Sequence, residues 1–156
     1  MKSIEHTKAF DMDCPAAELF PLFSPEGETL WVPGWHYENL METTVLCEDY
    51  VFLTRTQVHG STEAIWVVKR YEPAVYRVEF YRIEPDQKVG TVKVRCTALD
   101  DERTRVEVTY RYQALSRAGE AFISRFSVAA YDEFINEWQT LLTNYFASKC
   151  ERPSER

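Results

Sequence analysis

A run of alternating segments between about residue 41 and residue 114 constrains the fold more than any other feature of this chain. Turn signals interrupt the run every ten or so residues, which is typical of an antiparallel meander. Val92, Val94 and Cys96 alternate with Lys93 and Arg95, so we expect one face of the sheet to be dry and the other charged. The pattern predicts six strands, at Met41–Cys47, Tyr50–Val58, Glu63–Tyr71, Val75–Ile83, Val89–Leu99 and Thr104–Ala114, with one turn at His59-Gly60-Ser61.

The segment before the meander predicts a further strand and two short helices. Residues 3–13 alternate, with Ile4, His6, Lys8, Phe10 and Met12 on one face. Asp13 is a suitable N-cap and Pro15 suits a first helical turn, so a short helix is expected from about residue 14. Ser24-Pro25 ends it, a brief second helix follows, and residues 31–35 are too rich in turn formers for regular structure.

The segment after the meander predicts one long helix from Ser116, its N-cap, to about Ser148, because large apolar residues recur at three- and four-residue intervals. Such a helix is about 45 Å long. We expect it to cover the dry face of the sheet, which curls around it. Residues 1–150 then form a single domain, and residues 151–156 a disordered tail.

Composition excludes several classes of function. The 156 residues suffice for one hydrophobic core, and the net charge of −7 argues against nucleic acid as a partner. No apolar run reaches the length of a membrane span, so we expect no stable membrane insertion and a cytoplasmic protein. The five isolated glycines form no phosphate-binding loop, and the four cysteines lack metal-site spacing. We expect neither a metal nor a cofactor.

The order strand, two short helices, meander and long helix resembles the α+β helix-grip fold of the SRPBCC superfamily, which groups START lipid-transfer domains, birch-pollen-allergen-like proteins and polyketide cyclases/dehydrases. The segments Leu19–Pro25, Trp31–Trp35 and Tyr110–Ser116 carry the closest likeness, to a bacterial branch without settled activity. The resemblance covers nearly the whole chain. It implies a curved seven-stranded sheet wrapped around the C-terminal helix, with an apolar cavity between them that admits small hydrophobic molecules.

The four Trp, nine Tyr and nine Phe indicate where such a cavity lies. Many of these rings fall on surfaces that the sheet and the helix present to each other, and apolar walls with a few polar groups are typical of ligand pockets. We predict a carrier or sensor of a small lipid, isoprenoid, aromatic or polyketide-like molecule, gated by the Trp31–Trp35 loop. The predicted ligand-binding residues are Trp31, Trp35, Trp66, Phe80, Tyr110, Tyr112, Phe126, Tyr131 and Phe134.

Two other functions remain open. One is a cyclase or dehydratase that uses the same cavity, with His6 or a buried Glu as acid or base. The other is a co-chaperone-like protein-interaction module, which an exposed apolar patch and a filled core would favour. The sequence leaves open whether the protein is a monomer or a homodimer. It also leaves open which face of residues 63–71 points inward, since Lys69 and Arg70 are adjacent and either choice places a charge near the interior.

The remaining chemically active residues favour structural roles. His36 and Glu38 form an H-x-E pair without the cysteine ligands of a zinc deaminase site. Cys96 is expected to pack in the core, and Asp11 lies beside the predicted cap at Asp13. We expect Glu79 to lie on the outer face of the sheet. There, salt bridges are expected among Arg77, Lys93, Arg95, Arg105, Arg111 and neighbouring acidic residues.

Overall fold

The alternating segments form one seven-stranded sheet in which every neighbouring pair is antiparallel. The computed structural model describes residues 1–56 and 62–151. The first strand pairs with the last, so the order across the sheet is β1-β7-β6-β5-β4-β3-β2. The strands are β1 (Ser3–Met12), β2 (Tyr37–Asn39), β3 (Val51–Thr56), β4 (Thr62–Glu72), β5 (Arg77–Glu84), β6 (Lys88–Asp100) and β7 (Arg103–Ala114).

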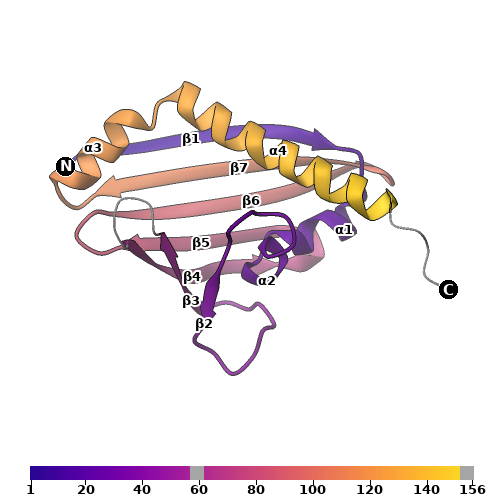
Figure 1. Ribbon diagram of the computed structural model, residues 1–156, viewed down its shortest axis with the longest axis horizontal. Coiled ribbons are helices and arrows are strands. Elements are labelled where there is room, and N and C mark those ends of the chain that lie inside the picture. The colour runs from indigo at the N-terminus through magenta and orange to yellow at the C-terminus, as the bar shows by residue number, and fades with distance from the viewer. Residues whose placement is uncertain (57–61, 152–156) are drawn as a thin grey trace.

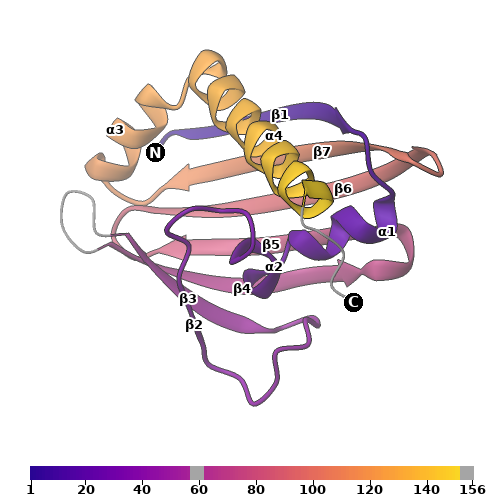
Figure 2. The same ribbon diagram turned by 45° about the vertical axis from the view of Figure 1, so that its right-hand side comes forward.

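The helices lie on one face of the curved sheet (Figure 1). Short helical turns follow β1, and two helices follow β7. They are α1 (Ala16–Leu19), η1 (Phe20–Leu22), α2 (Pro25–Glu28), α3 (Arg117–Arg125) and α4 (Val128–Glu151), with η2 (Pro73–Val75) between β4 and β5. The long helix α4 runs across the β1 and β7 side of the sheet, whereas α1 and α2 lie beside its C-terminal end (Figure 2). This arrangement confirms the predicted helix-grip fold.

The core follows the predicted alternation. Val92, Val94 and Cys96 of β6 are buried, as are Val106 and Val108 of β7. In β1, the face that carries Ile4, His6, Phe10 and Met12 points inward. Ile135 and Leu142 of α4 are completely buried. The dry face of the sheet and the inner face of α4 therefore form the single core that the sequence predicts.

The predicted strand Met41–Cys47 is wrong, because side chains in this segment bond to the backbone locally. The Asn39 amide group accepts from the Met41 N–H and donates to the Thr43 carbonyl, and the Thr43 hydroxyl accepts from the Val45 N–H. Such local bonds compete with a sheet ladder. The segment forms a loop, and β2 precedes it at Tyr37–Asn39. The predicted turn at His59-Gly60-Ser61 lies outside the described residues, as do residues 152–156 of the predicted tail.

The single predicted C-terminal helix is two helices, separated at Phe126 and Ser127. The Ser127 hydroxyl accepts from the Ala130 N–H, which caps a new helix start. The Phe126 carbonyl accepts from Nε2 of His6 at 2.6 Å. As a result α4 has 24 residues and is about 36 Å long rather than about 45 Å. The predicted cap at Ser116 is confirmed, since its hydroxyl accepts from the Gly119 N–H.

Two local predictions need correction, one at the start of α1 and one in β4. Asp13 does not cap the first helix, whose N-cap is Pro15 and has no side-chain hydrogen bond. In β4 neither adjacent charge enters the interior, because the register shifts between Val68 and Arg70. This irregularity leaves Lys69 and Arg70 both exposed while Val68 stays buried.

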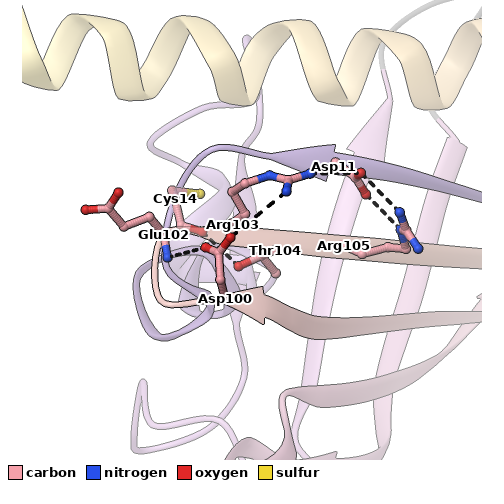
Figure 3. A network of polar contacts seen from close by, with 7 residues as sticks. All are labelled: Asp11, Cys14, Asp100, Glu102, Arg103, Thr104 and Arg105. Atoms are coloured by element: carbon pink, nitrogen blue, oxygen red, sulfur yellow. Dashed lines mark hydrogen bonds and ion pairs between the residues drawn. The ribbon is translucent and has the colours of Figure 1, made fainter.

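Hydrogen bonds and ion pairs connect the end of β1 to the β6–β7 hairpin (Figure 3). The buried Thr104 hydroxyl donates to the Cys14 carbonyl at 2.8 Å. The Arg105 guanidinium donates to both carboxylate oxygens of Asp11, at 2.8 and 3.2 Å, and this contact lowers the pKa of Asp11. Asp11 therefore serves as a structural ion-pair partner.

The outer face of the sheet carries the predicted salt bridges in part. Arg95 contacts Glu107 at 3.7 Å, and Lys69 contacts Glu79 at 3.7 Å. Glu79 lies on the outer face with Arg77 and Lys93, as expected.

Two positions near the short helices require glycine for different reasons. A Cβ atom at Gly27 would overlap the Pro21 carbonyl oxygen and lie 2.7 Å from Leu22 Cα, whereas one at Gly34 would meet no heavy atom within 4 Å. Gly34 instead has a φ of +72°, which disfavours other residues.

We expect Gly27→Ala to lower the free energy of unfolding by about 3 kcal/mol through overpacking, and Gly34→Ala by about 1 kcal/mol. Urea denaturation measures both, and equal effects would contradict this geometry.

Candidate ligand-binding cavity

A cavity of about 1040 Å³ lies between the sheet and α4. Its lining comes from the loop 32–36, from α2 and α4, and from five strands. The contributing side chains outside the loop are Glu28 of α2, Tyr37 and Glu38 of β2, Leu53, Thr54 and Arg55 of β3, Trp66 of β4, Arg82 of β5, Tyr110 of β7, and Phe134 and Trp138 of α4. The cavity is therefore built by residues that are distant in sequence and that meet only in the folded chain.

Six aromatic residues line the cavity, and several of their rings pack against one another or against rings behind them. The Trp66 ring is stacked on Phe52 at 5.5 Å and meets Trp35 edge-on at 6.3 Å. On the opposite side, Phe134 packs edge-on against Tyr110 at 5.3 Å. Edge-on and stacked pairs at these distances are favourable beyond simple burial. The aromatic part of the wall is thus apolar and held in place by these ring contacts.

Arg82 brings a positive charge to the aromatic part of the wall. Its side chain is 24% exposed, its guanidinium lies 5.1 Å from the centre of the Trp66 ring, and Nη1 donates to the Tyr112 hydroxyl at 3.4 Å. Its Nε is 3.6 Å from a carboxylate oxygen of Glu84. These contacts hold the guanidinium in one orientation, with the cavity in front of it.

Behind Arg82, Glu84 is shared with a second buried cation. The Lys88 ammonium lies 2.8 Å from the same carboxylate oxygen and 3.9 Å from the centre of the Phe122 ring. The Lys88 side chain is only 5% exposed, and burial lowers the pKa of its ammonium although Glu84 opposes the change. Two cations therefore share one carboxylate, and the trio Arg82, Glu84 and Lys88 carries a net charge of +1 when all three are ionised.

Glu28 places a carboxyl group on the same cavity. It is the last residue of α2, whose start is fixed by the Ser24 hydroxyl accepting from the Gly27 N–H. Burial raises the pKa of Glu28 to about 8, with Arg82 acting in the opposite direction. Among the described residues, none forms a hydrogen bond or an ion pair with this carboxyl group. At neutral pH the group is mostly protonated.

Four of the nine residues predicted to bind ligand line the cavity: Trp35, Trp66, Tyr110 and Phe134. Phe80, Tyr112, Phe126 and Tyr131 form a layer behind them, in ring contact with Trp66 or Tyr110. Trp31 is 5% exposed, donates from Nε1 to the Leu22 carbonyl, and lines a separate groove of about 370 Å³. That any of the nine contacts a ligand stays a prediction.

Sequence reasoning missed two charged residues of the cavity, Arg82 and Glu28. For Arg82 a signal exists, because the alternation that buries Val78 and Phe80 continues to Arg82 and Glu84 on the same face of β5. For Glu28 there is none, since a helix of four residues has no periodicity to analyse. Its position depends on how α2 packs over the sheet.

The other candidate residues have structural surroundings. His6 is partly buried, stacks on Tyr131 and donates to a backbone carbonyl, and it does not line the cavity. Burial raises the pKa of the Cys96 thiol to about 12, so it stays a protonated core residue as expected. His36 is exposed at the cavity, and Glu38 pairs with Arg55 at 3.4 Å. Within residues 1–56 and 62–151 no group of three or more His, Cys, Asp or Glu is placed to hold a metal ion.

Comparison with known proteins defines the fold. No family profile matches the chain, and no curated protein matches its sequence. Among solved structures, Ara h 8.0201 superposes with a TM-score of 0.68 at 11% identity, over 97% of this chain and 100% of that one. Norcoclaurine synthase from Thalictrum flavum, in complex with dopamine and hydroxybenzaldehyde, gives 0.65 at 10% identity over 99% and 90%.

A third structure, the di-domain ARO/CYC BexL from the BE-7585A biosynthetic pathway, gives a TM-score of 0.67 at 16% identity, over 97% of this chain and 48% of that one. The chain therefore has the same helix-grip fold as these three solved structures. At these identities the likeness establishes the fold and leaves the activity to be argued from the cavity. In the described part of the chain, no helix combines the length and apolarity that a membrane crossing needs.

The pKa of Glu28 predicts how stability depends on pH. Between about pH 4.5 and pH 8 the folded protein holds a proton that the unfolded chain releases, so this residue lowers stability as pH rises through that window. Glu28→Gln removes the ionisable carboxyl group and with it this loss of stability. We expect it to raise the free energy of unfolding by on the order of 2 kcal/mol at pH 8.5, because a tenfold change in proton affinity is about 1.4 kcal/mol and water in the cavity screens part of it.

Urea denaturation at pH 5, 7 and 8.5 measures this gain, which should grow with pH. Glu26→Gln, on the exposed side of the same helix, is the matched control. A gain for Glu28→Gln that does not change with pH would contradict the raised pKa.

Proposed function

We propose that the protein binds a small hydrophobic molecule in the cavity between the sheet and α4, as a carrier or a sensor. The observation that carries this proposal is the aromatic-walled cavity of about 1040 Å³, which is large enough for a molecule of several fused rings or a short lipid. Burial of the ligand's apolar surface supplies affinity, at about 25 cal/mol per Å². The ligand classes that fit are lipid, isoprenoid, aromatic and polyketide-like molecules.

Polar groups at defined places favour a ligand with one polar end. Trp35 and Trp66 donate their indole N–H groups to Pro25 and Thr54, so these donors are already satisfied. Arg82, Glu28 and Tyr110 are among the polar residues of the lining that can orient a ligand. The norcoclaurine synthase structure, whose overall fold is similar, holds dopamine and hydroxybenzaldehyde, two small aromatic molecules with polar substituents.

We place the proposed gate at the loop 32–36 rather than at the whole predicted Trp31–Trp35 loop, with Trp31 as its anchor. Trp31 is fixed by its bond to Leu22 and by edge-on packing against Trp138 at 5.6 Å. Beyond it, Pro33 and Gly34 are exposed, and residues 32–38 all line the cavity. Opening then requires movement from Val32 onward, with Trp31 held in place.

A second candidate function is a cyclase or dehydratase that acts on such a ligand. The observation that favours it is the Glu28 carboxyl group, whose pKa of about 8 suits a general acid at neutral pH, beside the Arg82 guanidinium. In a dehydration of a β-hydroxy ketone the Cβ–O bond would break, the Glu28 proton would leave with the hydroxyl group as water, and the Cα–H bond would supply the electrons of the new double bond while its proton passes to the Glu28 carboxylate so formed or to water. Incubation with a candidate β-hydroxy ketone, followed by mass analysis, tests this function, and product formation by Glu28→Gln at the rate of the parent protein would exclude Glu28 as the acid.

A third function, protein interaction through a filled core and an exposed patch, gains no support from a molecule that contains this cavity.

Ligand binding can be tested with N-phenyl-1-naphthylamine, a neutral aromatic probe that fluoresces in apolar surroundings. We expect saturable binding of one probe per chain, with a Kd in the micromolar range. Val32→Trp, which places a large ring at the cavity, should weaken binding at least tenfold. Leu30→Trp is the matched control, because Leu30 lies two residues away and lines the separate groove. Absence of saturable binding, or equal effects of the two variants, would contradict the proposed site.

A further inference from the structure

The charges around the cavity do not balance. Arg82 faces the cavity, and its only ion-pair partner among the described residues is Glu84 at 3.6 Å. Glu84 makes its closer contact, 2.8 Å, with Lys88 behind it. Two cations therefore share one carboxylate, and this group keeps a net charge of +1 beside the rings of Trp66 and Tyr112. An occupant of opposite charge would compensate that excess charge through charge-assisted hydrogen bonds, so the site favours such an occupant.

We propose that the cavity selects aromatic or polycyclic ligands that carry one anionic group, a carboxylate or sulfonate, and that Arg82 is the counter-ion of that group. This inference rests on the proposed ligand-binding function and specifies the class of its ligand. The guanidinium is planar and is held in place by Trp66, Tyr112 and Glu84, so two of its N–H groups can meet two oxygens of one anion.

Glu28 makes this selection depend on pH. Glu28 lines the same cavity, and the positive charge of Arg82 acts to lower its pKa, yet the two residues form no ion pair within 4.0 Å. When protonated, Glu28 is a neutral neighbour that can donate a hydrogen bond to the anion. When ionised, it repels the anion and competes for the guanidinium. Since the pKa of Glu28 is about 8, anion binding should weaken as pH rises through 8.

Other titratable groups face this part of the cavity and must be separated from Glu28. Tyr110 of β7 lies on the wall, and burial raises its pKa well above the ordinary value, so it stays neutral. His36, Glu38 and Arg55 line the loop side. Lys88 of β6 lies behind Arg82, and loss of its proton at high pH would also weaken anion binding. Variants of Glu28 distinguish its contribution from that of Lys88.

The test uses two probes with the same ring system. 8-Anilino-1-naphthalenesulfonate is an anion across pH 6.5–9.5, and N-phenyl-1-naphthylamine is its neutral counterpart without the sulfonate. Both are titrated by fluorescence with the full chain, and each is tested for displacement by the other. At pH 6.5 we expect the sulfonate to bind at least as tightly as the neutral probe, because Arg82 compensates the cost of removing its charge from water.

Arg82→Gln should weaken sulfonate binding at least tenfold and leave neutral-probe binding within twofold. Arg77→Gln is the matched control, since Arg77 lies on the same strand with its side chain on the outer face, and removes the same charge. From pH 6.5 to pH 9.5 the sulfonate Kd should rise about tenfold in the parent protein and stay level in Glu28→Gln, as one pH-linked proton allows. The neutral-probe Kd should not change with pH.

The failures are distinguishable. If neither probe binds, the result contradicts both the proposed function and this inference. If the neutral probe binds but the sulfonate binds tenfold more weakly or is not displaced by it, ligand binding stands and anion selection is overturned. An equal loss in Arg82→Gln and Arg77→Gln also overturns it. A pH dependence that persists in Glu28→Gln assigns the coupling to another group, Lys88 first, and overturns the role of Glu28.

Discussion

The width of the sheet is the constraint on which this structure depends. Seven strands about 4.8 Å apart span nearly 30 Å, whereas a helix with its side chains is about 10–12 Å across. A single helix therefore covers only part of the concave face. In this protein α4 lies over β1 and β7, and α1, α2 and the loop 30–36 cover more of this face (Figure 2). The cavity lies where these two coverings meet, because Phe134 and Trp138 of α4 line it together with Glu28 of α2 and the loop.

Aromatic residues make this arrangement stable without filling it. Rings are large and rigid, so they bridge the distance between the sheet and its roof while losing little conformational freedom. Edge-on contacts link Tyr110 to Phe134 and Trp138 across the interface. Because three indole N–H groups bond to backbone or side-chain oxygens on the wall or its roof, the rings are fixed in orientation as well as position. Rings held in this way keep the space between them open.

The architecture could be predicted from sequence because alternation and helical periodicity depend on burial, which the fold as a whole imposes. Local chemistry produced the errors. The Asn39 and Thr43 side chains turned an apparent strand into a loop, Ser127 divided the C-terminal helix, and the irregularity after Val68 in β4 kept Lys69 and Arg70 outside. Four of the residues predicted to bind ligand do line the cavity. Glu28 could not be predicted, because its position follows from the packing of one short helix rather than from any pattern.

The buried charges give the cavity its chemical character. An apolar residue at Arg82 would pack against Trp66 without the cost of desolvating a cation, and buried ion pairs rarely stabilise a fold relative to apolar replacements. Four ionisable groups nevertheless gather at one end of β5, β6 and α2: Arg82, Glu84, Lys88 and Glu28. At neutral pH they present a fixed cation and a mostly protonated carboxyl group to the same space. That pair suits the recognition of an anionic oxygen and also the transfer of a proton to one, so binding and catalysis would use the same two residues and differ only in whether the bound molecule has a bond that this proton can break.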